Sequence, residues 1–271
     1  METFFVHWAT CFGQPCPKLS RSRRSFLAFH PFFGLDGMRH TTSPGRPEAE
    51  PMTPTLVIAQ AKGTRENLSA VLGLIEEARY WLRDKGTDQW AAPWPDNEQR
   101  DSRVLRGLEV GATWIAWAGD EAAATVTIAS RANPAVWSGS DCNLADPAVY
   151  AHRLIVSRHF AGWGLGAELS DWTGLRGRRD YGARWIRVDV WTSNCALHGY
   201  YMKRGFEPCG ICPDPCYPSG ALLQKPVSEI AAPASPLFTE LEAEPYVSAE
   251  PWYKPTIRRT MPRLVPKLSL S

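Results

Sequence analysis

The chain has 271 residues, of which 44% are hydrophobic and 21% charged, and its formal net charge is +2. This length fits one large domain or two small ones, and the composition is that of an ordinary soluble globular protein. The small net charge provides no basic field for a nucleic acid or a membrane surface. No segment approaches the roughly 20 consecutive apolar residues of a transmembrane helix. We therefore expect no nucleic-acid partner and no membrane partner.

The cysteines are odd in number and lie at positions 11, 16, 142, 195, 209, 212 and 216. In a chain of this length, that is more typical of reduced thiols than of a disulfide framework. The N-terminal sequence METFFVHWATCFG has only a short apolar run, with no basic segment before it, which is unlike a secretory signal. These features predict a cytoplasmic protein.

Proline divides the chain into three parts. Of the 23 prolines, 7 lie within residues 1–54 and 8 within residues 225–271. Proline at this density interrupts both helices and strand ladders. We therefore expect three regions: a poorly ordered N-terminal extension (1–51), a folded domain (52–226) and a Pro-rich disordered tail (227–271).

Met52 stands directly before TLVIAQ, the first run that resembles a strand. This suggests the hypothesis that translation starts at Met52 and that residues 1–51 reflect a start assigned too far upstream. The intact mass of the natively expressed protein tests it, and a full-length N-terminus would reject it.

The first half of the domain predicts a strand, one helix and a hairpin. Asn67 can cap the helix and Gly86 can end it, with apolar residues every three or four positions between them. Gly119–Asp120 suits a hairpin turn. The expected elements are a strand (56–60), a helix (67–85), a loop (87–107) and two paired strands (112–117 and 123–130).

The second half alternates strands with helices. After a strand at 150–156, a glycine-rich turn opens a helix with an apolar face at Leu165, Leu169 and Trp172. A strand follows at 186–190, and Asn194 then caps a helix that ends at Gly205. The last strand region extends from Phe206 to Leu223. The resulting order, β-α-β-β-β-α-β-α-β-β, predicts a mixed α/β domain and not a doubly wound one.

The turn AGWGLG between a strand and a helix is typical of an anion-binding loop. Its glycines at 162, 164 and 166 allow consecutive backbone N–H groups to point outward, beside the positive end of the helix dipole. Arg158 can add a charged contact to a pyrophosphate. The turn contains no Walker lysine and lacks the dinucleotide spacing G-x-G-x-x-G. A glycine-rich turn without a ligand remains the alternative.

Two segments together resemble the GNAT superfamily of acyl-CoA-dependent N-acetyltransferases. VSRHFAGWGLGAEL carries the two glycines of the R/Q-x-x-G-x-G/A signature at Gly164 and Gly166, although Ala161 replaces the usual Arg or Gln. NCALHGYYMKRGF, from Asn194 to Phe206, carries the second signature in full: an Asn, an apolar helix and Tyr-x-x-x-Gly-Phe. The resemblance covers roughly residues 55–224 and includes the order of the elements.

The resemblance implies a central sheet whose two middle strands splay apart, with acetyl-CoA as co-substrate in the gap. The strand backbone before the turn would pair with the pantetheine arm, the turn would hold the pyrophosphate, and Asn194 would contact the pantetheine while also capping its helix. The implied binding residues are Leu154, Ile155, Val156, Arg158, Gly162, Trp163, Gly164, Leu165, Gly166, Ala167 and Asn194.

Two residues are the candidates for catalysis. By the resemblance, Tyr201 would protonate the leaving thiolate of coenzyme A. The strand at 150–156 contains no acid, so His152 is the nearest group with a suitable pKa to act as base, and Asp189 and Glu109 are weaker candidates. A hydrogen-bonded core tyrosine and a structural histidine are the alternatives.

The predicted function is acetyl transfer from acetyl-CoA to an amine of a small molecule or peptide, and a homodimer would be common for the superfamily. The alternative is a non-catalytic acyl-CoA-binding module that acts through a partner. Cys209, Cys212 and Cys216 suggest a third class, a zinc-dependent interaction protein. These three sulfurs are one ligand short of a zinc site, so we expect no metal.

Overall fold

The computed structural model of the protein describes residues 56–241, so the predicted extension at 1–51 and the chain beyond 241 lie outside the described residues. The described part contains an eight-stranded sheet in the order β6-β7-β5-β4-β3-β2-β1-β8. Neighbouring strands are antiparallel except for the pairs β4–β5 and β1–β8. The strands are β1 Leu56–Gln60, β2 Thr113–Ala118, β3 Glu121–Ala129, β4 Ala148–Val156, β5 Trp185–Val190, β6 Glu207–Ile211, β7 Ala221–Pro226 and β8 Phe238–Glu240.

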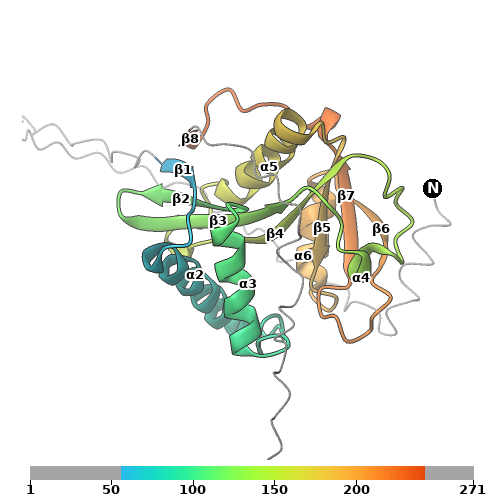
Figure 1. Cartoon of the computed structure of the whole chain (residues 1–271), viewed down its shortest axis with the longest axis horizontal. Helices are drawn as coiled ribbons and strands as arrows, with labels where there is room; N and C mark the ends of the chain where they lie inside the picture. The colour runs from blue at the N-terminus through green and yellow to red at the C-terminus, as the bar shows by residue number, and fades with distance from the viewer. Residues whose placement is uncertain (1–55, 242–271) are drawn as a thin grey trace, which may run out of the picture. The chain divides into compact units, whose positions relative to one another are not determined.

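Helices cover both faces of this mixed sheet. Helices α2 and α3 pack together on the face that carries Ile115 and Ile155 (Figure 1). Helix α5 packs on the opposite face so closely that a Cβ at Gly177 would lie 2.5 Å from a methyl group of Val149. The helices are α2 Arg65–Asp84, α3 Asn97–Glu109, α4 Pro134–Trp137, α5 Leu165–Tyr181 and α6 Cys195–Lys203, with 3₁₀ turns η1 Arg158–Phe160 and η2 Val227–Glu229.

Helix α3 lies largely inside the segment 87–107, for which a loop was predicted, and that prediction is wrong. Asp96 caps the helix, because its carboxylate accepts the amide of Gln99 at 2.8 Å. Val104 and Leu108 are its only large buried side chains, so its apolar stripe is narrow. The Trp- and Pro-rich residues before the helix also favoured the prediction of a loop.

One smaller expectation also needs correction. The cap of α2 is Thr64 and not Asn67, since the Thr64 hydroxyl accepts the Asn67 amide at 3.3 Å.

Arg187 in β5 is a charged residue of the core, since it is 0% exposed. Its guanidinium donates to the Tyr150 hydroxyl at 2.8 Å and to the Asn143 carbonyl at 2.9 Å. Central strand β5 is therefore covered on both faces.

The chain remains ordered beyond residue 226, so the predicted disordered tail is wrong for residues 227–241. Strand β8 pairs in parallel with β1 at the edge of the sheet. Glu240 anchors it to α5: its carboxylate accepts from Trp172 at 2.7 Å and from Arg179 at 2.6 Å, and it also pairs with Arg176. One carboxylate therefore contacts three side chains of α5, a long-range contact that proline density does not reveal.

Candidate active site

The two central strands separate part-way along their length. Strands β4 and β5 pair only from Ala148↔Trp185 to Ala151↔Val188, although β4 continues to Val156. The divergence begins at a bulge, where Arg153 has φ +49° and the register against β3 shifts. A bulge increases the local twist and bends the strand. The structure thus confirms the predicted splay and leaves one edge of the last β4 residues unpaired with any described strand.

The glycine-rich turn follows β4 directly and opens α5. Gly162 and Gly164 have φ +88° and +83°, and a Cβ at either position would meet nothing within 4 Å. Gly164 is the N-cap of α5 and provides no side-chain cap. Within residues 56–241, no group accepts the amides of Leu165 and Gly166. The open N–H groups and the positive end of the helix form an anion-binding surface.

The other predicted residues of the turn lie around this surface with different roles. The Ala167 amide already donates to the Gly164 carbonyl at 2.9 Å. An anion would therefore be bound by the amides of the preceding residues, Leu165 and Gly166. Trp163 is 37% exposed. The guanidinium of Arg158 stacks on α2, 4.3 Å from the centroid of the Trp81 ring.

Tyr200 is a residue of this surface that is not among the residues predicted from the sequence. Its hydroxyl would lie 3.7 Å from a Cβ at Gly166, whereas Val156 would lie at 3.3 Å. Tyr200 is 40% exposed. The hydroxyl therefore reaches the first turn of α5. The sequence signal that could have identified Tyr200 is its position directly before Tyr201 in the second signature.

The second signature folds as helix α6, in which Asn194 and Tyr201 both have defined positions. The Asn194 carboxamide oxygen accepts the Leu197 amide at 3.0 Å, which confirms its role as cap, and its nitrogen donates to Gln89 at 2.6 Å. Tyr201 is 7% exposed, and no described residue hydrogen-bonds its hydroxyl. Burial, followed by Tyr200 and Asp189, raises the pKa of Tyr201. The phenol is therefore protonated at neutral pH.

His152 and Asp189 meet across the splay. The two atoms His152 Nδ1 and Asp189 Oδ1 are 3.1 Å apart, and the side chains are 14% and 6% exposed. The other Asp189 oxygen accepts from the Tyr217 hydroxyl at 2.7 Å. The charge of Asp189 also contributes to raising the pKa of Tyr201, after burial and Tyr200. Glu109 lies beside Gly63 instead, at the far end of α3.

The connection between α2 and α3 covers the same region. The Trp94 ring packs edge-on against Tyr217, with centroids 5.2 Å apart, and its Nε1 donates to the Cys216 carbonyl at 3.1 Å. Asp88, in the same connection, accepts from Trp191 Nε1 at 3.0 Å. This connection therefore bridges the β5–α6 turn and the β6–β7 loop. Trp94 and Tyr217 provide an aromatic wall beside His152 and Asp189.

Comparison with known proteins identifies the enzyme class. No family model matches the chain. A relative from Bacillus subtilis (strain 168), named uncharacterized N-acetyltransferase YesJ, is 32% identical over 149 residues, which are 54% of this chain and 79% of the relative. The chain belongs to the GNAT superfamily of N-acetyltransferases. It is therefore an acyltransferase.

Solved structures that are similar to this N-acetyltransferase include GNAT-family acetyltransferases from Streptococcus agalactiae 2603 and Listeria monocytogenes 4b F2365. The first is 21% identical with a TM-score of 0.48 and covers 63% of this chain and 95% of its own. The second is 20% identical with a TM-score of 0.47, covering 63% and 94%. The PaiA N-acetyltransferase from Thermoplasma acidophilum, in complex with coenzyme A, is 14% identical with a TM-score of 0.46, covering 64% and 99%.

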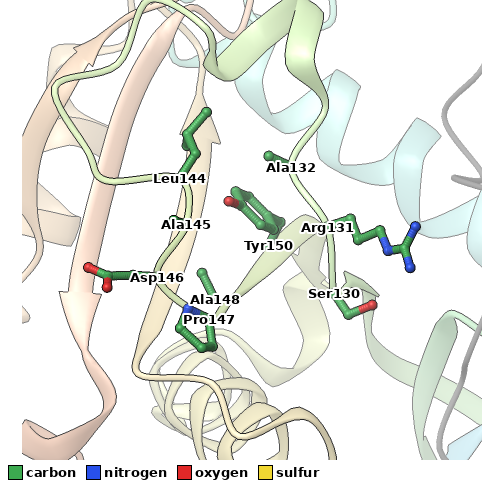
Figure 2. A pocket seen from close by; sticks show the side chains of 9 residues that line it. All are labelled: Ser130, Arg131, Ala132, Leu144, Ala145, Asp146, Pro147, Ala148 and Tyr150. Carbon is green, nitrogen blue, oxygen red and sulfur yellow. The ribbon is translucent and has the colours of Figure 1, made fainter.

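One described cavity of this N-acetyltransferase lies away from the splay. Its volume is about 280 Å³, and it lies where β4 begins, with Tyr150 and Leu144 on its walls (Figure 2). The Arg131 side chain points away from Tyr150 in the same view. The splay lies at the other end of β4. The cavity is thus distinct from the group formed by His152, Asp189 and Tyr201.

The cysteine cluster does not converge on one point. Cys209 and Cys212 are buried in the core around Trp137, whereas Cys216 is exposed in the β6–β7 loop. Across residues 56–241, no three His, Cys, Asp or Glu side chains are grouped to hold a metal ion. No helix in that range is both long and apolar enough to span a membrane.

Proposed function

We propose that this chain transfers the acetyl group of acetyl-CoA directly to a primary amine of a small molecule or peptide, with both substrates bound together. The observation that carries the proposal is the early end of the β4–β5 pairing. It leaves a strand edge with which no strand in residues 56–241 pairs, and this edge leads straight into the anion-binding start of α5. Acetyl-CoA, when bound, supplies a thioester whose acetyl carbon the amine attacks.

The residues present fit this co-substrate. One edge of the β4 segment Leu154–Val156 pairs with β3, through Thr125↔Ile155 and Ala124↔Val156, so the opposite edge can pair with an amide-containing arm as a further strand would. The open amides around Gly164 suit a pyrophosphate, and a Cβ there would meet nothing. We expect Arg158, at the start of the turn, and Asn194, at the start of α6, to add polar contacts.

Tyr201 is the proposed acid. Burial disfavours the phenolate and keeps the proton on Oη at neutral pH, so the hydroxyl can donate a hydrogen bond to the leaving thiolate and protonate it as coenzyme A departs. The absence of a hydrogen bond to this hydroxyl within the described chain leaves it available for that contact.

His152 is the proposed base. Asp189 faces its Nδ1 at 3.1 Å, which favours the tautomer with the proton on Nδ1 and makes Nε2 the basic nitrogen. Asp189 is in turn oriented by the Tyr217 hydroxyl. His152 can thus accept the amine proton, and Asp189 stabilises the imidazolium that forms.

Calorimetric titration of acetyl-CoA and free coenzyme A into the full chain tests the proposal. Micromolar binding, about −8 kcal/mol, is expected. Thiol release should then depend on an added amine and be lost in His152→Gln, while acetyl-CoA affinity is kept. A folded sample that binds neither compound would reject the proposal.

A further inference from the structure

The entrance of the glycine-rich turn is held by helix α2. A single oxygen of Glu77, Oε1, accepts the backbone amide of Arg158 at 2.7 Å and the hydroxyl of Ser157 at 3.3 Å. Ser157 is buried, and its own amide donates to the Ala123 carbonyl in β3 at 2.9 Å. The residues that follow β4 are therefore fixed both to β3 and to α2.

Short contacts connect this junction with the turn itself. Ser157 is the N-cap of η1, and its carbonyl accepts the Phe160 amide at 3.1 Å. The buried Phe160 ring packs edge-on against Trp163, with centroids 5.3 Å apart, and the Phe160 carbonyl accepts the Trp163 amide at 3.4 Å. Trp163 directly precedes Gly164, the N-cap of α5. The position of the open amides at the start of α5 therefore depends on how η1 is held.

The neighbouring glutamate of α2 has a different role. Glu76 forms ion pairs with Arg79 at 3.1 Å and with Arg100 of α3 at 3.0 Å. Within residues 56–241, no lysine or arginine side chain forms an ion pair with Glu77. A carboxylate that accepts a backbone amide makes a charge-assisted hydrogen bond, which is stronger than a neutral one. Glu77 therefore stabilises the junction before the turn, whereas Glu76 joins α2 to α3.

Helix α2 contacts the same junction a second time, one helical turn later. The Arg158 guanidinium lies 4.3 Å from the centroid of the Trp81 ring. Trp81 follows Glu77 by four positions, so the two side chains lie on one face of α2. The backbone and the side chain of Arg158 are thus both held by this face.

We propose that Glu77 is a positioning residue of the acetyl-CoA site. By fixing the end of β4 to α2, it holds the turn in the conformation in which the amides of Leu165 and Gly166 are open to the diphosphate of the co-substrate. The inference rests on the proposed function and adds to it a residue that acts through the turn. Without the Glu77 contacts, the turn would have to be ordered as the diphosphate binds, and this cost would lower the affinity.

Calorimetry on the full chain tests the proposal with acetyl-CoA and with its two halves. S-acetylpantetheine lacks the diphosphate and 3′-phospho-ADP contains it, and displacement titrations with acetyl-CoA measure these weaker ligands. Glu77→Ala should lower the affinity for acetyl-CoA and for 3′-phospho-ADP about tenfold, because hydrogen bonds to a charged group are lost. The affinity for S-acetylpantetheine should stay unchanged. An equal loss for both halves, which general damage to the fold would produce, or no loss for either would overturn the proposal.

Two further variants separate geometry from charge and from helix packing. Glu77→Gln keeps the accepting oxygen and should retain most of the wild-type affinity for acetyl-CoA. Glu76→Ala is the matched control, because it removes ion pairs from the same helix and should leave this affinity unchanged. The proposal is overturned by the same loss in Glu76→Ala, or by a loss in Glu77→Gln as large as in Glu77→Ala. A higher affinity in both Glu77 variants would show charge repulsion of the diphosphate instead, and would also overturn it.

Urea unfolding of each variant separates failure of this inference from other failures. If Glu77→Ala does not fold, Glu77→Asp takes its place, because a side chain shorter by one methylene group should weaken both contacts and give a smaller loss confined to acetyl-CoA and 3′-phospho-ADP. Wild-type binding of acetyl-CoA without this selective loss in a Glu77 variant rejects the inference alone. Absence of acetyl-CoA binding in the wild-type chain rejects the proposed function and the inference with it.

Discussion

The two ends of the β4–β5 pair differ although they belong to the same two strands. At the paired end, Tyr150 packs edge-on against Trp137, with centroids 5.1 Å apart, and accepts from the fully buried Arg187. At the splayed end, His152 and Asp189 stand in a gap without ladder hydrogen bonds between the strands. The bulge in β4 therefore separates the paired part of the two strands from the candidate site over only two residues.

Each end also contains an arginine, and their surroundings differ in kind. Arg187 is bound by neutral acceptors: the Tyr150 hydroxyl, the Asn143 carbonyl and, at 3.3 Å, the Gln224 carboxamide. Burial and the charge of Arg103 lower the pKa of Arg153, whereas Tyr217 and Asp189 raise it. Buried polar groups with complete partners stabilise a fold, whereas clustered charges are typical of functional sites. We therefore expect substitutions at the paired end to change stability and those at the splayed end to change catalysis.

Tyr201→Phe should give the largest effect, at the splayed end. Removing the proton donor is expected to lower turnover about 10²- to 10⁴-fold, because general acid catalysis contributes that much. Coenzyme A affinity, measured by calorimetry, should change little. Tyr200→Phe is the matched control and should weaken affinity more than turnover, since its hydroxyl lies over Gly166. Collapse of affinity in Tyr201→Phe with turnover retained would contradict the assigned role.

Trp137→Ala should give the largest loss of stability, at the paired end. Trp137 is 0% exposed, so its truncation leaves a large cavity and is expected to lower the free energy of unfolding by about 3–5 kcal/mol. Urea unfolding measures this loss. His152→Gln should leave the unfolding free energy nearly unchanged while lowering turnover. If the two variants lost stability and activity in parallel, the contrast between the ends would be wrong.

Gly164→Ala should have an intermediate effect at the start of α5. Its φ of +83° is costly for alanine, by about 1–2 kcal/mol, and the strained turn should bind acetyl-CoA more weakly. Gly182→Ala carries the same kind of strain, at φ +64°, at the other end of α5. It should destabilise similarly without altering affinity. Equal affinity losses in both variants would argue against a role for the turn.

The smallest effect concerns Cys142 near the paired end. A hydrogen bond with the Cys209 thiol lowers the pKa of Cys142 most, and Arg187 lowers it further, against the opposing effect of burial. The native thiolate is therefore present at lower pH than in the unfolded chain, and alkylation by iodoacetamide should begin at lower pH. Mass spectrometry of the labelled peptide measures the midpoint. Cys209→Ala should raise the pH midpoint of alkylation, whereas Cys209→Ser should keep part of the lowering of the Cys142 pKa. An unchanged midpoint in both variants would contradict the assigned role of Cys209.

Local patterns in the sequence predicted much of the fold. The strand Leu56–Gln60, the hairpin of β2 and β3, the glycine turn and the Asn194 cap all appear where expected. Each depends on residues close together in the chain: alternation, a two-residue turn, positive-φ glycines or one capping side chain. The signatures at Gly164 and Tyr201 were recognisable for the same reason.

Only the tertiary structure decided the remaining features. Helix α3 is stable because two side chains find a core made by other elements, and β8 is ordered because Glu240 meets α5. The pairing of His152 with Asp189 depends on how far β4 and β5 stay in register before the bulge. The sequence by itself determined the superfamily and the local turns. Tertiary packing decided which charged groups face one another, because those contacts join residues that are distant along the chain.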